Sequence, residues 1–192
     1  MSNNNTPVII SFYTNNWKYR ELAERMREDC QRLGLNHDIV LLEGSGDWLH
    51  NTRLKAGFIT DMLDKYKHIV WVDVDSKIEK LPILFFHQYR PLLLRPHSTV
   101  KGRLWHVSVM GITRTPQTVS LCHDWKVKIA GLKEVTDEFC FDLVIREHMD
   151  IPVQHLPAEY MLLPHEQKTD SIISVGLSQD PSKLQRKYHE KK

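Results

Sequence analysis

The chain of 192 residues is as long as a single domain that can bury a substantial core. Its apolar share of 41% and its charged share of 26% are typical of a globular protein and exclude a disordered, collagen-like or disulfide-stapled chain. The formal net charge is +2, but the charge is unevenly distributed. No acid lies between Lys80 and His123, and the last ten residues hold five basic side chains and one acid.

The sequence also bears on where the protein works. No apolar run approaches the roughly 18 residues of a membrane span, and the first residues lack the basic and apolar regions of a secretory signal. The three cysteines, Cys30, Cys122 and Cys140, have no C-x-x-C spacing and are typical of free thiols in a reducing compartment. We therefore expect a cytoplasmic protein without a membrane span.

The first half of the chain predicts alternating strands and helices. In chain order these are a strand at Val8–Tyr13, a helix after Asn16 that ends before Gly34, a strand at Asp38–Leu42, a helix at Asn51–Tyr66 and a strand at His68–Val74. Apolar residues recur every three or four positions in the helices, whereas the strands are continuous apolar runs. This order, with buried strands, indicates a parallel sheet covered by helices.

The second half is less regular. The apolar, proline-containing segment Leu81–Pro96 predicts a loop with a short helix, and Trp105–Ile112 predicts a strand. Thr115 and Thr136 are positioned to cap two helices, and short strands are expected at Val153–Leu156 and Ser171–Val175. Together the elements predict one α/β domain over residues 1–180, followed by a basic, flexible tail over residues 181–192.

The feature that points most directly to a functional site is a strongly apolar strand followed by two acids, Asp73 and Asp75. Side chains two apart on a strand point the same way, so both carboxylates are expected on one face. They follow a parallel strand, at the edge where open α/β sheets bind ligands. Two neighbouring carboxylates repel each other, and Mn²⁺ or Mg²⁺ is the simplest partner for them. The pattern predicts a divalent-metal site.

The acidic pair is one of several segments in a particular order along the chain. These are Val8–Thr14, a helix headed by Arg53 and Lys55, Trp71–Asp75, Val107–Ile112, Thr136–Glu138 and Leu156–Tyr160. They resemble segments of GT-A glycosyltransferases. In the same order, these are the base-holding loop, the basic-headed helix, the DxD signature, the strand facing the donor sugar, the acidic motif near the acceptor and the closing Leu-Pro-x-x-Tyr segment. The resemblance implies a GT-A-like, Rossmann-related α/β fold: a single domain with a mostly parallel central sheet flanked by helices.

This resemblance also implies a reaction and a donor site. The reaction is metal-dependent transfer of a sugar from a nucleotide-sugar donor, expected to be UDP-linked, to an acceptor hydroxyl. The metal, Mn²⁺ or Mg²⁺, is expected on Asp75 and Asp73. The expected donor-binding residues are Phe12, Tyr13, Thr14, Arg53, Lys55, Asp73, Asp75, Met110 and Gly111. Many relatives add a histidine on the last strand as a metal ligand, but Ile173–Gly176 has none, and His165 is the nearby substitute.

The catalytic residues depend on the stereochemistry of transfer. An inverting reaction needs a general base, for which Asp137 is the first candidate and Glu138 the second. A retaining reaction needs no such base. Both acids also lie where they would favour a helix N-terminus through its dipole, which is an alternative reason for their presence.

The acid-free segment between Lys80 and His123 bears on the acceptor. It suggests an anionic acceptor bound by Arg95, Lys101 and Arg103 through phosphate contacts. Small GT-A relatives include phage enzymes that glycosylate hydroxylated pyrimidines in DNA, which makes such a base the best single expectation and the host cytoplasm the location if a phage encodes the chain. A glycan or lipid-linked saccharide is the alternative acceptor. The simpler interpretation is a surface whose charge is balanced by acids elsewhere in the fold.

Three other functions stay open at this stage. Haloacid-dehalogenase-like phosphatases also place Asp-x-Asp after a buried strand, but usually on the first strand and without a lysine such as Lys77 two residues later. An all-helical metal phosphohydrolase would use histidines and acids in the order His87 or His106, His123-Asp124 and Asp142. A non-catalytic module would bind the nucleotide sugar without transfer.

Overall fold

A six-stranded sheet in the order β2-β1-β3-β6-β5-β7 forms the centre of the protein. The computed structural model describes residues 6–45, 47–97, 102–166, 170–181 and 183. In these residues β6 is antiparallel to its neighbours β3 and β5, and the other pairings of the sheet are parallel. The strands are β1 (Val8–Tyr13), β2 (His37–Leu41), β3 (His68–Val72), β5 (Leu92–Pro96), β6 (Trp105–Thr113) and β7 (Val153–His155).

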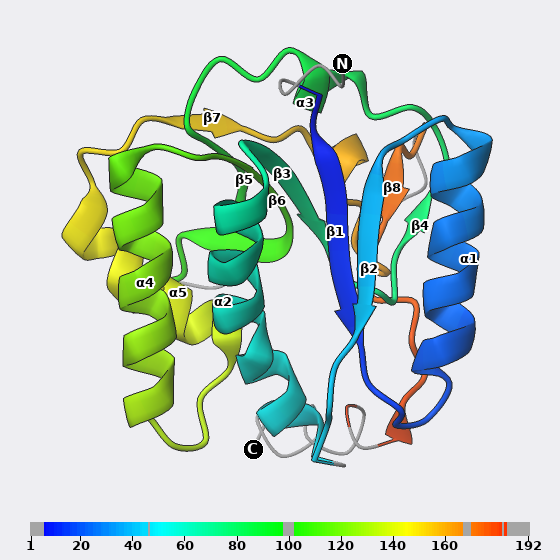
Figure 1. Cartoon of the computed structure of the whole chain (residues 1–192), viewed down its shortest axis with the longest axis horizontal. Helices are drawn as coiled ribbons and strands as arrows, with labels where there is room; N and C mark the ends of the chain where they lie inside the picture. Colours follow the sequence, from blue (N-terminus) through cyan, green and yellow to red (C-terminus); the bar gives the residue numbers. More distant parts are fainter. Residues whose placement is uncertain (1–5, 46, 98–101, 167–169, 182, 184–192) are drawn as a thin grey trace.

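Helices cover both faces of this sheet (Figure 1). Helix α1 and a small sheet of β4 and β8 lie on one face, whereas α2, α4 and α5 lie on the other. The remaining elements are α1 (Tyr19–Arg32), α2 (Trp48–Lys65), β4 (Lys77–Ile78), α3 (Ile83–Phe86), α4 (Pro116–Gly131), α5 (Asp137–Ile145) and β8 (Ile173–Ser174), with short 3-10 turns at Arg146–His148 and Ala158–Tyr160. The protein is thus a single α/β domain with a mostly parallel central sheet flanked by helices, as the sequence predicts.

Two hydrophobic cores follow from the alternation of side chains along the strands. In β1, Ile9 packs in the core that contains Met26 of α1, whereas Ile10 packs in the core that contains Ile59 of α2. Trp71 of β3 lies on the α2 side and is almost completely buried. The first half of the chain therefore folds as its continuous apolar runs predict, with β1 and β3 buried on both faces.

Local sequence signals set several helix ends. Gly34 has a φ of +65° immediately beyond α1, a conformation that glycine adopts without a steric penalty. Asp47 accepts a hydrogen bond from the backbone N–H of Leu49 at the start of α2. Thr115 and Thr136 cap α4 and α5 as predicted. The three cysteines are free and buried, also as predicted.

Apart from shifts of a few residues at element ends, such as the start of α2 at Trp48 rather than Asn51, the structure differs from the predicted elements in the segment before β6 and after β3. A strand, β5, forms at the end of the segment expected to be a loop with a short helix, although the short helix itself is present as α3. Residues Leu92–Leu94 are buried because β5 lies between β6 and β7. The third strand ends at Val72 rather than Val74, since Asp73–Ser76 forms a turn in which the Ser76 N–H donates to the Asp73 carbonyl at 3.0 Å.

The six-stranded sheet excludes the all-helical phosphohydrolase architecture. Among the described residues, no helix is both long enough and apolar enough to cross a membrane. The predicted flexible tail falls mostly on residue 182 and residues 184–192, which lie outside the described residues. Lys183 is described, and it contacts the candidate site.

Candidate active site

A pocket of about 300 Å³ opens where β1 and β3 end. Parallel strands bring their carboxyl ends to the same edge of a sheet, and an antiparallel neighbour brings its start there. The pocket is accordingly lined by the end of β1, the turn after β3, the start of β6, the first turns of α2 and α5, and parts of the C-terminal segment. Its lining residues include Phe12, Tyr13, Thr14, Tyr19, Trp48, Asn51, Lys55, Trp71, Asp73, Asp75, Val107, Ser108, Asp137, Glu138, Pro164, Gly176 and Lys183.

The two acids after β3 meet at this pocket through a turn. The backbone N–H of Asp73 still pairs with the sheet, donating to the Ser108 carbonyl at 2.9 Å. Asp75 lies two residues further on, inside the turn. The sequence predicts that both side chains line one site, and they do, but the alternation of a strand is not the cause.

Lys55 holds two of the acids together. Its Nζ lies 2.9 Å from Asp73 Oδ1 and 2.5 Å from Asp137 Oδ2, and it donates to the Val107 carbonyl at 3.3 Å. Burial by itself would lower the pKa of Lys55, but the carboxylates of Asp137 and Asp73 outweigh burial and raise this pKa above its ordinary value. The ammonium is therefore a permanent positive charge at the bottom of the pocket.

Asp75 has a different lysine partner. Lys183 Nζ lies 2.6 Å from Asp75 Oδ2, and the same oxygen accepts a hydrogen bond from the Ser178 hydroxyl at 2.6 Å. Burial would raise the pKa of Asp75, but Lys183 and Ser178 lower it below its ordinary value. The segment is anchored further by the Leu177 N–H, which donates to the Asp75 carbonyl at 2.8 Å.

Asp137 and Glu138 begin α5 and also line the pocket. The Thr136 side chain caps the helix, and Trp125 Nε1 donates to the Asp137 carbonyl at 3.1 Å, so the position of this turn is fixed from two sides. The side chain of Asp137 is 8% exposed and that of Glu138 is 29% exposed. Both carboxylates thus reach the pocket as the sequence predicts, and Glu138 is the more accessible.

Met110 and Gly111, which were predicted to bind the donor, do not line the pocket. They pair with Trp71 and Val70 in the middle of the sheet, because β6 is antiparallel and presents its start to the pocket. The strand was predicted correctly, but Val107 and Ser108 line the pocket in place of Met110 and Gly111.

Arg53, which was also predicted to bind the donor, contacts the end of another helix instead. Its guanidinium donates to the carbonyl groups of Ile129 and Leu132 at the end of α4, so it satisfies a helix C-terminus. It is not among the residues that line the pocket. Lys55, two residues later in the same helix, does line it.

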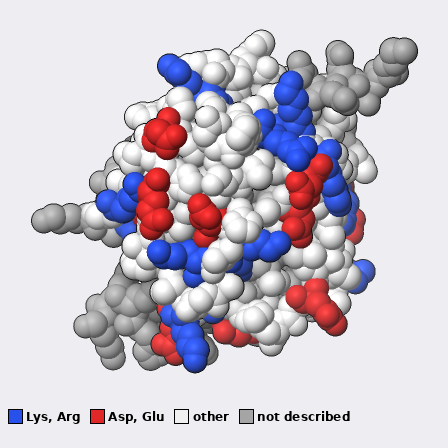
Figure 2. All heavy atoms as spheres, turned by 60° about the vertical axis from the view of Figure 1, so that its left-hand side comes forward, with Lys and Arg blue, Asp and Glu red and all other residues white. Residues whose placement is uncertain are grey.

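The predicted acceptor residues do not form a free basic surface. Arg95 forms a two-oxygen ion pair with Glu166 and donates to the Met161 carbonyl, and Arg103 pairs with Asp142 at 2.9 Å and with Glu138 at 3.2 Å. Lys101 lies outside the described residues. Figure 2 shows basic and acidic side chains next to one another on one face. The acid-free segment is therefore balanced by acids from elsewhere in the fold.

The residues expected to hold the nucleotide base do line the pocket. Phe12, Tyr13 and Thr14 lie at the end of β1, and one side of the Tyr13 ring faces the Arg27 guanidinium at 5.3 Å from the ring centre. Sequence reasoning missed the aromatic residues Trp48 and Tyr19, which also line the pocket. A signal for Trp48 was present, since Asp47 directly before it is a typical helix N-cap.

Ser178 and Lys183 were also missed, because their contacts span more than a hundred residues. The basic composition of the tail was the one available signal. His165, the substitute considered for a late metal ligand, is exposed and does not line the pocket, whereas Ser178 contacts Asp75 directly.

The donor set fits a hard divalent ion. Asp73 and Asp75 offer carboxylate oxygens, the ligands that Mn²⁺ and Mg²⁺ prefer. One oxygen of each acid already faces a lysine ammonium, so a cation is accommodated at both carboxylates. An ion on Asp75 would take the place of the Lys183 ammonium.

Comparisons with known proteins bear on the fold. In sequence the chain matches no protein-family model and no curated protein. In structure it is similar to a solved glycosyltransferase involved in the glycosylation of the major capsid of PBCV-1, with a TM-score of 0.70 over 97% of this chain and 100% of that chain. The two chains are 11% identical. The likeness establishes that this chain has the fold of that glycosyltransferase.

Proposed function

We propose that this protein is a glycosyltransferase that moves a sugar from a nucleotide-sugar donor, UDP-linked, to an acceptor hydroxyl. The observation that carries the proposal is one pocket in which the acids after β3, Lys55 and the acids of α5 converge. Support comes from the edge of the sheet on which this pocket lies, where α/β folds bind nucleotides. The glycosyltransferase with the same fold adds further support.

The residues of the pocket have distinct proposed roles. Asp75 and Asp73 would hold Mn²⁺ or Mg²⁺, which supplies positive charge for the diphosphate leaving group. Lys55 fixes Asp73 against Asp137, so the donor side and the acceptor side of the pocket keep their separation. Phe12 and Tyr13 form the wall on which the base of the nucleotide rests.

Asp137 is the proposed base of an inverting reaction. Its carboxylate lines the pocket and contacts the ammonium of Lys55. The acceptor hydroxyl loses its proton to this base as its oxygen bonds to the sugar carbon.

A neutral saccharide hydroxyl is the proposed acceptor. Four carboxylates and two lysines line the pocket, a charge balance that disfavours a polyanion such as DNA. The arginines that favoured DNA in the sequence are held in internal ion pairs. The similar protein is involved in the glycosylation of a capsid protein, which also agrees with a non-nucleic-acid acceptor.

The donor site is tested by Asp75→Asn. Calorimetric titration of UDP with Mn²⁺ should give binding that is lost or weakened at least tenfold in the variant, because the amide no longer supplies a charged ligand. Asp64→Asn is the matched control, since Asp64 is exposed on α2 and far from the pocket lining. Equal UDP affinity in all three proteins with Mn²⁺ would contradict the site.

The base is tested by Asp137→Asn. We expect transfer to fall by roughly 10²- to 10⁴-fold, because an amide cannot accept the proton. The affinity for UDP and Mn²⁺ should stay within about threefold, since Asp73 and Asp75 are unchanged. Full activity in this variant would remove Asp137 as the base.

The acceptor and the reaction class are tested by screening UDP-sugars against simple saccharides and hydroxymethylated DNA. Transfer to saccharides supports the proposal, and transfer to the DNA alone would replace the proposed acceptor. Hydrolysis of a phosphate ester without any sugar transfer would instead favour the phosphatase alternative. Binding of UDP-sugar with neither transfer nor hydrolysis would indicate a non-catalytic module.

A further inference from the structure

Three potential metal ligands meet beside the pocket, apart from the pair Asp73 and Asp75. His97 directly follows β5, His106 lies in β6, and Glu138 lies in the first turn of α5. One donor atom from each residue lies within 4.8 Å of the other two. His106 Nδ1 is 3.3 Å and His97 Nε2 is 3.8 Å from the same oxygen, Glu138 Oε1.

The two imidazoles converge on the buried oxygen Glu138 Oε1. Both contacts, at 3.3 and 3.8 Å, are longer than the roughly 2.7–3.2 Å of ordinary N–H···O hydrogen bonds. The rings of His97 and His106 are stacked with centres 4.0 Å apart, and both direct a nitrogen at this oxygen.

The charges around the cluster also call for a cation. Arg103 contacts the other oxygen of Glu138 at 3.2 Å and Asp142 at 2.9 Å, so two carboxylates share one guanidinium. Imidazole nitrogens and carboxylate oxygens are ligand types that divalent transition metals bind.

We propose that His97, His106 and Glu138 form a binding site for a divalent transition-metal ion of the zinc type. Two imidazoles and one carboxylate are a known zinc ligand set, and neighbouring ligands of a tetrahedral zinc lie about 3.3 Å apart. Two of the three donor-atom distances, 3.3 and 3.8 Å, are at or near this spacing, and the third is at most 4.8 Å. The site differs in chemistry from Asp73 and Asp75, whose oxygens suit Mn²⁺ and Mg²⁺.

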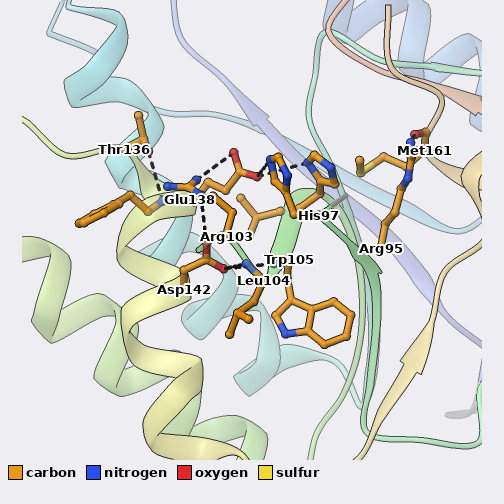
Figure 3. A network of polar contacts seen from close by, with 12 residues as sticks. Arg95, His97, Arg103, Leu104, Trp105, Thr136, Glu138, Asp142 and Met161 are labelled. Atoms are coloured by element: carbon orange, nitrogen blue, oxygen red, sulfur yellow. Dashed lines mark hydrogen bonds and ion pairs between the residues drawn. The ribbon is translucent and has the colours of Figure 1, made fainter. Parts of the chain in front are cut away.

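The surrounding residues orient the ligands. Arg103 holds the second oxygen of Glu138, and Asp142 holds Arg103 and accepts hydrogen bonds from the backbone N–H groups of Leu104 and Trp105 (Figure 3). Such partners behind the ligands fix carboxylate orientation in metal sites. Because its ligands come from β5, β6 and α5, the ion would tie the start of α5 to the sheet. The proposal does not depend on sugar transfer.

Calorimetric titration of the chelator-treated full chain with Zn²⁺, without nucleotide, tests this site. We expect one tight Zn²⁺ in the wild type, and binding at least 30-fold weaker in His106→Asn and in Glu138→Gln. Saturating Zn²⁺ should raise Tm by about 5 °C or more. Co²⁺ should give the intense visible absorption of a four- or five-coordinate site with nitrogen ligands, and the same variants should lose it.

Two controls make the outcome decisive. Asp75→Asn removes a carboxylate of the other site, and His123→Asn removes an exposed histidine beside Asp124, and both should keep Zn²⁺ affinity within about threefold. The proposal would be overturned if Asp75→Asn lost Zn²⁺ binding while His106→Asn kept it. It would also be overturned if the wild type bound Zn²⁺ no more tightly than Glu138→Gln does. A variant with a changed circular-dichroism spectrum is replaced by His97→Asn, for which the same outcomes apply.

Discussion

At the scale of single residues, the pocket depends on how each charge is paired. Lys55 is almost fully buried and is tolerated there because two carboxylates and a carbonyl surround its ammonium. The indole N–H of Trp71 donates to Asp73 Oδ1 at 3.0 Å, so this acid is oriented from its own strand as well. Removing Lys55 would leave two acids without their shared counter-charge.

Outside the pocket, the buried Arg95 is likewise paired with an acid, Glu166. The contribution of this ion pair to stability can be measured. The Arg95 guanidinium lowers the pKa of Glu166 to about 2, with a backbone N–H of Leu163 assisting. A carboxyl whose folded pKa is depressed stabilises the fold above its unfolded pKa, and this contribution is lost as pH falls toward 2.

We therefore expect Glu166→Gln to lower the free energy of unfolding by about 2 kcal/mol at pH 7. The difference from wild type should stay constant down to about pH 5 and shrink as the pH approaches 3, as measured by urea unfolding. Exposed Glu147→Gln is the control, since Glu147 pairs only loosely with Lys128 at 3.5 Å. A difference that persists unchanged at pH 3 would contradict the assigned ion pair.

At the scale of elements, the C-terminal segment completes the site. Residues 176–181 and Lys183 lie beside the turn after β3, and Leu177, Ser178 and Lys183 all contact Asp75. Lys183 therefore supplies, from the chain itself, the positive charge that a divalent ion would bring to the same carboxylate. The lysine and the ion compete for Asp75 Oδ2.

We expect Lys183→Ala to increase the affinity for Mn²⁺ in the absence of nucleotide by about fivefold, because the competing ammonium is gone. The free Mn²⁺ signal in electron paramagnetic resonance measures this directly. Lys77→Ala is the matched control, because Lys77 is exposed and pairs with Glu79 rather than with Asp75. Unchanged or weaker Mn²⁺ binding in Lys183→Ala would show that the two cations do not compete.

At the scale of the whole molecule, acids and bases are distributed so that no large basic surface forms on the face in Figure 2. Acids from α2, α5 and the segment after β7 neutralise the acid-free stretch: Asp64 pairs with Arg114, Asp142 with Arg103, and Glu166 with Arg95. A protein that binds DNA through phosphates needs uncompensated cations. The net charge of +2 therefore does not indicate such a surface.

This charge balance predicts the effect of removing both arginines. Arg95→Ala combined with Arg103→Ala should lower the free energy of unfolding by about 3 kcal/mol or more, because buried acids lose their partners. Any binding of duplex DNA at 150 mM salt should be weak and unchanged. A salt-dependent loss of DNA affinity in the double variant, at unchanged stability, would restore the nucleic-acid acceptor.

Local patterns in the sequence determined much of this protein. Continuous apolar runs identified β1, β2 and β3, and Gly34, Thr115 and Thr136 fixed helix ends, because these signals act within a few residues. The resemblance to GT-A glycosyltransferases placed Asp73, Asp75 and Asp137 in one site, and the structure brings them together.

The tertiary structure alone decided which charges are free and which residues of β6 reach the pocket. Met110 and Gly111 were expected where Val107 and Ser108 lie, since register depends on the antiparallel pairing of β6 with β3. The pairing of Lys183 with Asp75 likewise joins residues far apart in the chain. Such contacts depend on packing between elements, which residue type and spacing do not encode.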